Sequence, residues 1–170
     1  EIKEKMSAKV ETFVQVKNPL WESAVPEVIA VCQNAAAAAW RATLDEEDVF
    51  EATIVLADDG LVATLNHDFR QQNEPTNVLS FPTDEAARLV PEGIAEMPNL
   101  GDIVIAFETT QSEAPDDLAN HLSHLVVHGC LHLLGHNHEA EDEASIMESL
   151  ETKILAKLGI ADPYLEIIID

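Results

Sequence analysis

The alternation of apolar and polar residues predicts several short strands. Residues 9–16 (KVETFVQV) alternate and contain Val and Phe, and residues 50–56 (FEATIVL) are rich in residues that favour strands. Residues 77–81 form a short apolar run that stops at Pro82, and residues 100–107 (LGDIVIAF) have the nearly continuous apolar character of a buried strand. The pattern therefore predicts roughly four strands.

Other stretches have helical spacing. Apolar residues recur at helical intervals from residue 20 to about residue 43, and Pro26 is tolerable only near a first turn, so the helix is expected to begin there. Residues 58–60 (DDG) end the second strand and cap a helix that runs to about Arg70. Residues 84–99 mix charge with proline and glycine, which predicts a surface loop.

The second half of the chain predicts two more helices and completes the fold class. Asp116 or Asp117 is expected to cap a long histidine-containing helix, and residues 141–158 predict a last helix with Gly159 at its C-terminal end. This mixed order of elements predicts an α+β fold, with a small, roughly four-stranded mixed sheet and helices packed on it. The length favours one domain over residues 1–170.

The formal net charge of −23 excludes a broad basic surface for nucleic acid, because such surfaces depend on Lys and Arg contacts with phosphates. There is no lysine between Lys17 and Lys153, and no arginine after Arg88. Contact with nucleic acid therefore has to be local, through a few arginines and a cation in a cleft. The acidic surface itself indicates high solubility, adaptation to salt, or a basic partner such as a ribosomal protein.

Cysteine usage and hydropathy indicate a compartment. Cys32 and Cys130 do not make a disulfide framework and are expected to be buried thiols. No apolar run is long enough to span a bilayer, and the first residues lack the apolar core of a secretory signal. A reduced, cytoplasmic protein is expected.

The candidate chemistry lies in residues 121–138 (HLSHLVVHGCLHLLGHNH), which contain six of the seven histidines. Helix positions i and i+4 are about 40° apart around the axis and roughly 6 Å apart along it. His128 and His132 can therefore direct two imidazoles to one spot. Gly135 allows a left-handed turn that returns the chain and delivers a third histidine. Three imidazoles with no fourth protein ligand are typical of a catalytic zinc site.

Spacing leaves some choices among the histidines open. His124, His128 and His132 form an i, i+4, i+8 series that spans roughly 12 Å, too far for all three to bind one ion. The pair His128 and His132 is preferred because it places the following turn where it can deliver the third ligand. His124 is then a neighbour, either a substrate contact or a group behind the ligands. Spacing does not choose between His136 and His138 as the third ligand.

Gly129 follows His128 at the position where zinc peptidases of the H-E-x-x-H kind carry a general-base glutamate. Its presence weakens a peptidase interpretation. Zinc can still activate a nucleophile without that base.

With these residues in view, the chain resembles the YbeY family of bacterial ribosomal-RNA maturation endoribonucleases. The family's signature is similar to residues 128–138 (HGCLHLLGHNH). The resemblance covers about residues 50–155 and includes, in order, Asn66-x3-Arg70, residues 75–81 (PTNVLSF), residues 100–105 (LGDIVI) and Met147-x3-Glu151.

The resemblance implies that His128, His132 and His138 ligate a single Zn²⁺ ion, and that Arg70 is functional in the cleft. Phosphodiester cleavage builds negative charge on the phosphoryl oxygens, which a guanidinium beside a zinc ion can stabilise. From the sequence alone, the alternative for Arg70 is a helix C-terminal cation that interacts with the helix dipole.

The resemblance also implies a single-strand-specific, metal-dependent endoribonuclease in rRNA maturation and ribosome quality control. Its expected partners are single-stranded RNA or rRNA, with ribosomal proteins or the small ribosomal subunit, and neither DNA nor a membrane. Two alternatives stay open: a zinc hydrolase of peptide or amide bonds, and a non-catalytic ribosome-assembly factor that binds basic proteins. Asn77 and Asn137 stand where the family usually has Asp, and the change at Asn137 can weaken ligand orientation.

Overall fold

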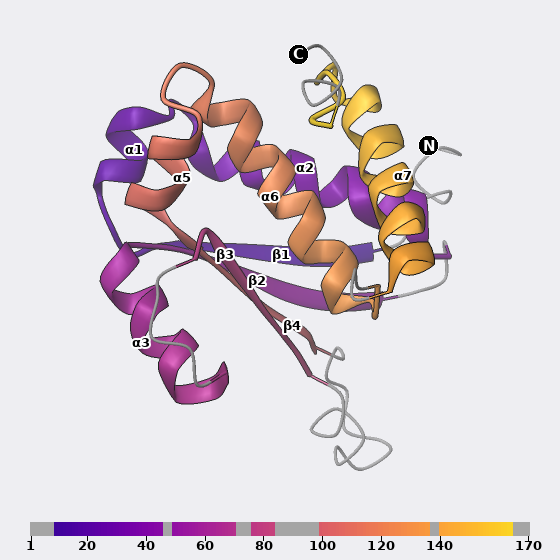
Figure 1. The fold of residues 1–170 in the computed structure, drawn as a ribbon, viewed down its shortest axis with the longest axis horizontal. Coiled ribbons are helices and arrows are strands. Elements are labelled where there is room, and N and C mark those ends of the chain that lie inside the picture. Colours follow the sequence, from indigo (N-terminus) through magenta and orange to yellow (C-terminus); the bar gives the residue numbers. More distant parts are fainter. Residues whose placement is uncertain (1–8, 46–48, 71–75, 84–98, 137–139, 165–170) are drawn as a thin grey trace.

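The computed structural model describes residues 9–45, 49–70, 76–83, 99–136 and 140–164. The predicted loop at residues 84–99 lies outside these ranges, except for Asn99. The elements, in chain order, are β1 (Lys9–Val16), α1 (Leu20–Ala24), α2 (Val28–Thr43), β2 (Val49–Ala57), α3 (Asp59–Arg70), β3 (Val78–Pro82), β4 (Asn99–Ala106), α5 (Phe107–Glu113), α6 (Leu118–Leu133) and α7 (Glu141–Lys157) (Figure 1). None of the described helices combines the length and apolarity needed to cross a membrane.

The four described strands form one mixed sheet in the order β1-β2-β4-β3, which confirms the α+β prediction. β1 pairs in parallel with β2, and β2 in parallel with β4, while β3 runs antiparallel to β4. β1 and β3 are thus the edge strands. An edge position accommodates Pro82 at the end of β3, because proline has no N–H to give to a further strand.

Side-chain alternation along the central strands gives the sheet two different faces. Ile54 and Leu56 of β2 face the main core together with α2 and α6, whereas Ala57 packs with Val62 of α3 and Val104 of β4 in a smaller cluster. Successive strand residues point to opposite faces, so α6 and α3 cover opposite sides. Figure 1 shows α3 below the sheet and α2, α6 and α7 above it.

A close contact with the sheet fixes the position of α6. Gly129 lies so near β4 that a Cβ atom at this position would be 2.8 Å from Cγ2 of Ile103. The Ser80 hydroxyl of β3 also donates to the carbonyl of Gly129 at 3.4 Å. The helix backbone therefore rests on β3 and β4, and the histidines lie around its other faces.

The predicted left-handed turn after the histidine helix is confirmed. Gly135 has φ +99°, and its N–H donates to the carbonyl of His132 at 3.0 Å. The N–H of His136 donates to the carbonyl of Leu131 at 3.0 Å. This pair of bonds is the Schellman ending of a helix, in which glycine is favoured because it has no Cβ. Gly159 ends α7 in the same way, with φ +78°.

Three local predictions need correction. The segment before Pro26 is helical as well, and a residue of positive φ, Glu27 at +57°, separates α1 from α2. Phe107, expected to end the last strand, begins α5 and packs edge-on against Trp21 with ring centroids 5.0 Å apart. Asp117 occupies the N-cap position of α6, but its side chain makes no capping hydrogen bond.

Candidate functional site

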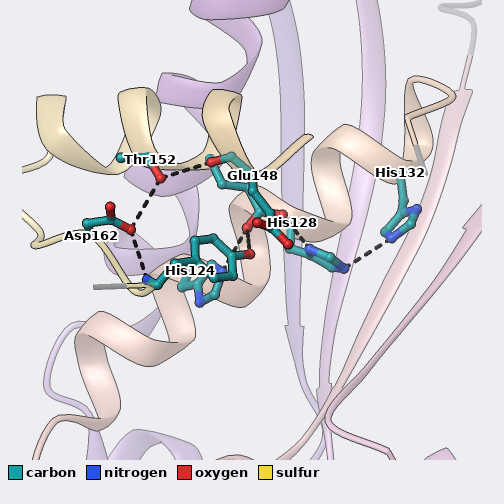
Figure 2. Close-up of polar contacts among 8 residues, drawn as sticks. His124, His128, His132, Glu148, Thr152 and Asp162 are labelled. Carbon is teal, nitrogen blue, oxygen red and sulfur yellow. Dashed lines mark hydrogen bonds and ion pairs between the residues drawn. The ribbon is translucent and has the colours of Figure 1, made fainter. Parts of the chain in front are cut away.

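α6 brings two of the three predicted ligands together. The Nε2 atoms of His128 and His132 lie 3.0 Å apart, with ring centroids 4.6 Å apart (Figure 2). Two nitrogens bound to one tetrahedral zinc at about 2.0–2.1 Å lie about 3.3 Å apart. The observed spacing is therefore close to that of a pair sharing one cation. Both side chains are half-buried, so solvent reaches the pair.

Glu151 of α7 contacts the ring of His128 at Nδ1, the nitrogen that does not face His132. Its Oε2 atom lies 2.5 Å from Nδ1 of His128, and the residue is 0% exposed. A carboxylate accepts hydrogen bonds, so Nδ1 carries the proton and Nε2 keeps its lone pair on the side of His132. A carboxylate behind a histidine in this way is the arrangement that prepares imidazole to ligate a metal.

The other oxygen of Glu151 is held by two groups. His124 places Nε2 2.9 Å from Oε1, and the hydroxyl of Tyr164 donates to the same atom. Because the Nε2 atom of His124 is engaged with Glu151, His124 lies behind the pair formed by His128 and His132. This geometry favours the pair His128 and His132 over the alternative pair His124 and His128.

The charge state of this buried network follows from its contacts. Burial raises the pKa of Glu151, but hydrogen bonds from His124 and His128, the electrostatic interaction with His128 and the bond from Tyr164 outweigh it and lower the pKa to about 2. For Tyr164, burial and then the hydrogen bond to the Glu151 carboxylate raise the pKa of the phenol well above its usual value. At neutral pH the Glu151 carboxylate is therefore ionised. The Tyr164 phenol is protonated and donates a hydrogen bond to it.

The remaining predicted site residues are not brought to this pair by the described part of the chain. His138 lies in residues 137–139, outside the described ranges. Within those ranges no group of three or more His, Cys, Asp or Glu side chains is placed to hold a metal. Arg70 ends α3 on the opposite side of the sheet from α6, and its side chain is not among those described.

An acidic cavity of about 480 Å³ opens beside His121 and His124 at the start of α6. Its lining includes four carboxylates, from Glu113, Asp116, Asp117 and Asp162. Phosphate is repelled by such a lining, because binding of a nucleic-acid backbone depends on cationic groups. The cavity is therefore unsuited to binding a nucleic-acid backbone.

Sequence reasoning did not assign a role to Glu151, although the residue belongs to the family-like stretch Met147-x3-Glu151. A signal was present on α7. Glu151 shares its helix face with Met147, Ile154 and Leu155, all of which are buried. A single acid within an apolar helical stripe indicates a buried carboxylate that needs partners.

Comparison with known proteins found related sequences over most of this chain. The sequence profile of the family described as Endoribonuclease YbeY matches residues 9–159. Two proteins named Endoribonuclease YbeY are similar over nearly their whole length. That of Paramagnetospirillum magneticum is 49% identical over 164 residues, covering 94% of this chain and 98% of its own. That of Azorhizobium caulinodans is 46% identical over 159 residues, covering 91% and 96%. The matched range includes the whole of α6 and Glu151.

Proposed function

This chain belongs to the YbeY endoribonuclease family, and we propose that it is a metal-dependent endoribonuclease that cleaves single-stranded RNA in rRNA maturation and ribosome quality control. The observation that supports the proposal most directly is the pair of Nε2 atoms of His128 and His132, 3.0 Å apart, with a buried carboxylate behind His128. In this proposal the protein acts in the cytoplasm, on RNA associated with ribosomal proteins or the small ribosomal subunit.

We assign His128, His132 and His138 as the ligands of one Zn²⁺ ion. The described donors fit this group, because two imidazole nitrogens meet and one of them is oriented by Glu151. The turn at Gly135 ends α6 shortly before His138 in the sequence, which is the proposed third ligand. A zinc ion supplies Lewis-acid activation of a nucleophile when it is bound. His128, His132 and His138 would hold the ion, with no fourth protein ligand proposed.

We assign Arg70 the role of stabilising the negative charge that develops on the phosphoryl oxygens during cleavage. Its guanidinium, which keeps its proton at any working pH, can form two parallel hydrogen bonds to phosphoryl oxygens. Removing one such donor typically costs about 10²–10³-fold in rate. In a chain with a net charge of −23, a local cation of this kind has to replace the broad basic surface of other nucleases.

The proposal is tested with the wild type, His132→Ala and Arg70→Ala, and with Arg41→Ala as a matched control, since Arg41 is an exposed arginine of α2. Bound metal is measured by mass spectrometry, and cleavage is measured on labelled single-stranded and duplex RNA. We expect His132→Ala to lose both metal and cleavage, and Arg70→Ala to keep the metal but lose cleavage. Arg41→Ala should match the wild type.

Several outcomes would contradict this assignment. Undiminished cleavage in both His132→Ala and Arg70→Ala would indicate a contaminating nuclease. Unfolding of His132→Ala would indicate a metal that serves the fold, as in an assembly factor, whereas a catalytic ligand is lost with most of the fold retained. The product end leaves the assignment intact and distinguishes two nucleophiles, because a 2′,3′-cyclic phosphate would identify the ribose hydroxyl and not water.

A further inference from the structure

We infer that Glu151 is a positioning residue, which selects the metal-binding tautomer of His128 while Tyr164 and His124 hold its carboxylate in place. The inference rests on the proposed metal-dependent function, which it deepens by explaining how one ligand is prepared. The proton concerned is the one on Nδ1 of His128.

The two oxygens of Glu151 are not equivalent. Oε1 accepts from two donors, His124 Nε2 at 2.9 Å and the Tyr164 hydroxyl, whereas Oε2 accepts from His128 Nδ1 at 2.5 Å. The carboxylate is fully buried, so water does not compete for these sites. Oε2 is therefore available to His128, and the proton on Nδ1 of His128 points toward Glu151 and away from His132.

The segment after α7 is tied to this network. The carboxylate of Asp162 accepts from the backbone N–H of Tyr164 at 2.8 Å and from the Thr152 hydroxyl at 3.3 Å, which connects the segment to α7 (Figure 2). The ring of Tyr164 also stands edge-on to His124, with centroids 5.8 Å apart. Tyr164 is thereby placed so that its hydroxyl points at Glu151 and limits rotation of the carboxylate.

Replacing Glu151 by glutamine separates this role from simple packing. Glutamine has nearly the same volume, but one oxygen becomes an NH₂ donor. The amide oxygen is expected to face the two donors, His124 and Tyr164, so its NH₂ group faces Nδ1 of His128. Nδ1 must then accept, which moves the proton of His128 to Nε2, the atom that has to bind the metal.

The first measurement is the tautomer of His128 in metal-free wild-type protein, read from two-bond ¹H–¹⁵N correlations of its ring. We expect the Nδ1–H tautomer at a pH where the ring is neutral. The Nε2–H tautomer in the wild type would overturn the inference, whatever the variants do. This measurement requires neither zinc nor RNA.

The second measurement compares Glu151→Gln with Glu22→Gln, which changes an exposed glutamate of α1. Zinc affinity is measured by competition with a chromophoric chelator. We expect Glu151→Gln to shift His128 to the Nε2–H tautomer and to bind zinc about 10–100-fold more weakly, while Glu22→Gln matches the wild type. Wild-type tautomer and affinity in Glu151→Gln would overturn the inference. A wild type that binds zinc but does not cleave RNA would instead contradict the proposed function alone.

Discussion

Gly129 packs against Ile103 so closely that any Cβ at position 129 would overlap the isoleucine side chain, at 2.8 Å from its Cγ2 atom. Position 129 therefore faces the sheet and not the histidine pair. A zinc peptidase of the H-E-x-x-H kind needs a general-base glutamate at this position. The fold thus gives a steric reason, in addition to the residue identity, against the peptide-hydrolase alternative.

Gly129→Ala should destabilise the protein by about 1–3 kcal/mol, because the added methyl group forces a buried helix away from β4. The free energy of unfolding is measured by urea titration. Gly60→Ala is the matched control, since a Cβ there would meet the Asp58 carboxylate at an ordinary 3.5 Å. Gly60→Ala should be neutral or slightly stabilising. Equal stability of the two variants would show that α6 can move away from the sheet at little cost.

His124→Ala should retain one zinc ion per chain, whereas His132→Ala should lose it. The reason is that His124 directs Nε2 to Glu151, while His132 directs Nε2 to His128. Metal content by mass spectrometry distinguishes the two variants, and circular dichroism checks that both are folded. The reverse result, with metal lost only from His124→Ala, would establish the pair His124 and His128 as the ligands.

Asn77→Asp should destabilise the protein modestly, by about 0.5–1 kcal/mol. The amide of Asn77 donates to the Glu113 carboxylate at 3.0 Å, and an aspartate would place two negative charges in contact. In a Glu113→Gln background the cost should largely vanish, which a double-mutant cycle by urea unfolding measures. A cost that persists unchanged in that background would show that Glu113 is not the cause.

The two thiols should be inert in the folded protein at about pH 8. Burial raises the pKa of Cys32 to about 12, and burial followed by the nearby Cys32 raises the pKa of Cys130 further. Both groups therefore stay protonated at this pH, and the thiolate is the reactive form. Ellman's reagent should react only after denaturation, when both cysteines become available. Rapid reaction of the native protein would contradict the burial of at least one thiol.

Much of the fold was readable from local pattern. Residues 9–16 were predicted as a strand and form β1, because the run is rich in β-branched residues and places Val10, Val14 and Val16 on one face. The left-handed turn at Gly135 was likewise predicted, because a glycine directly after a long helical stretch is a typical helix ending. α5 was not predicted, because FETTQSE has no clear apolar period and Phe107 continues the apolar run of β4. The strand order depends on contacts between distant residues, which no local pattern contains.

The candidate site was predictable only in part for a similar reason. The spacing of His128 and His132 within one helix is a local property, and the structure places their Nε2 atoms together as spacing predicts. Glu151 belongs to another helix, and its role depends on how α7 packs against α6. A single sequence shows a glutamate within an apolar stripe of its helix, which indicates a buried carboxylate but does not identify its partners. The assignments of His138 and Arg70 remain predictions.

The carboxylate that orients His128 comes from α7, and the tyrosine that supports it follows α7 in the chain. A ribosome makes a protein from the N-terminus, and the early parts begin to fold first. Both histidines are therefore synthesised before Glu151 and Tyr164. The orientation of His128 depends on α7 having packed against α6, so a chain cut before α7 would contain both histidines but lack the carboxylate that holds Nδ1.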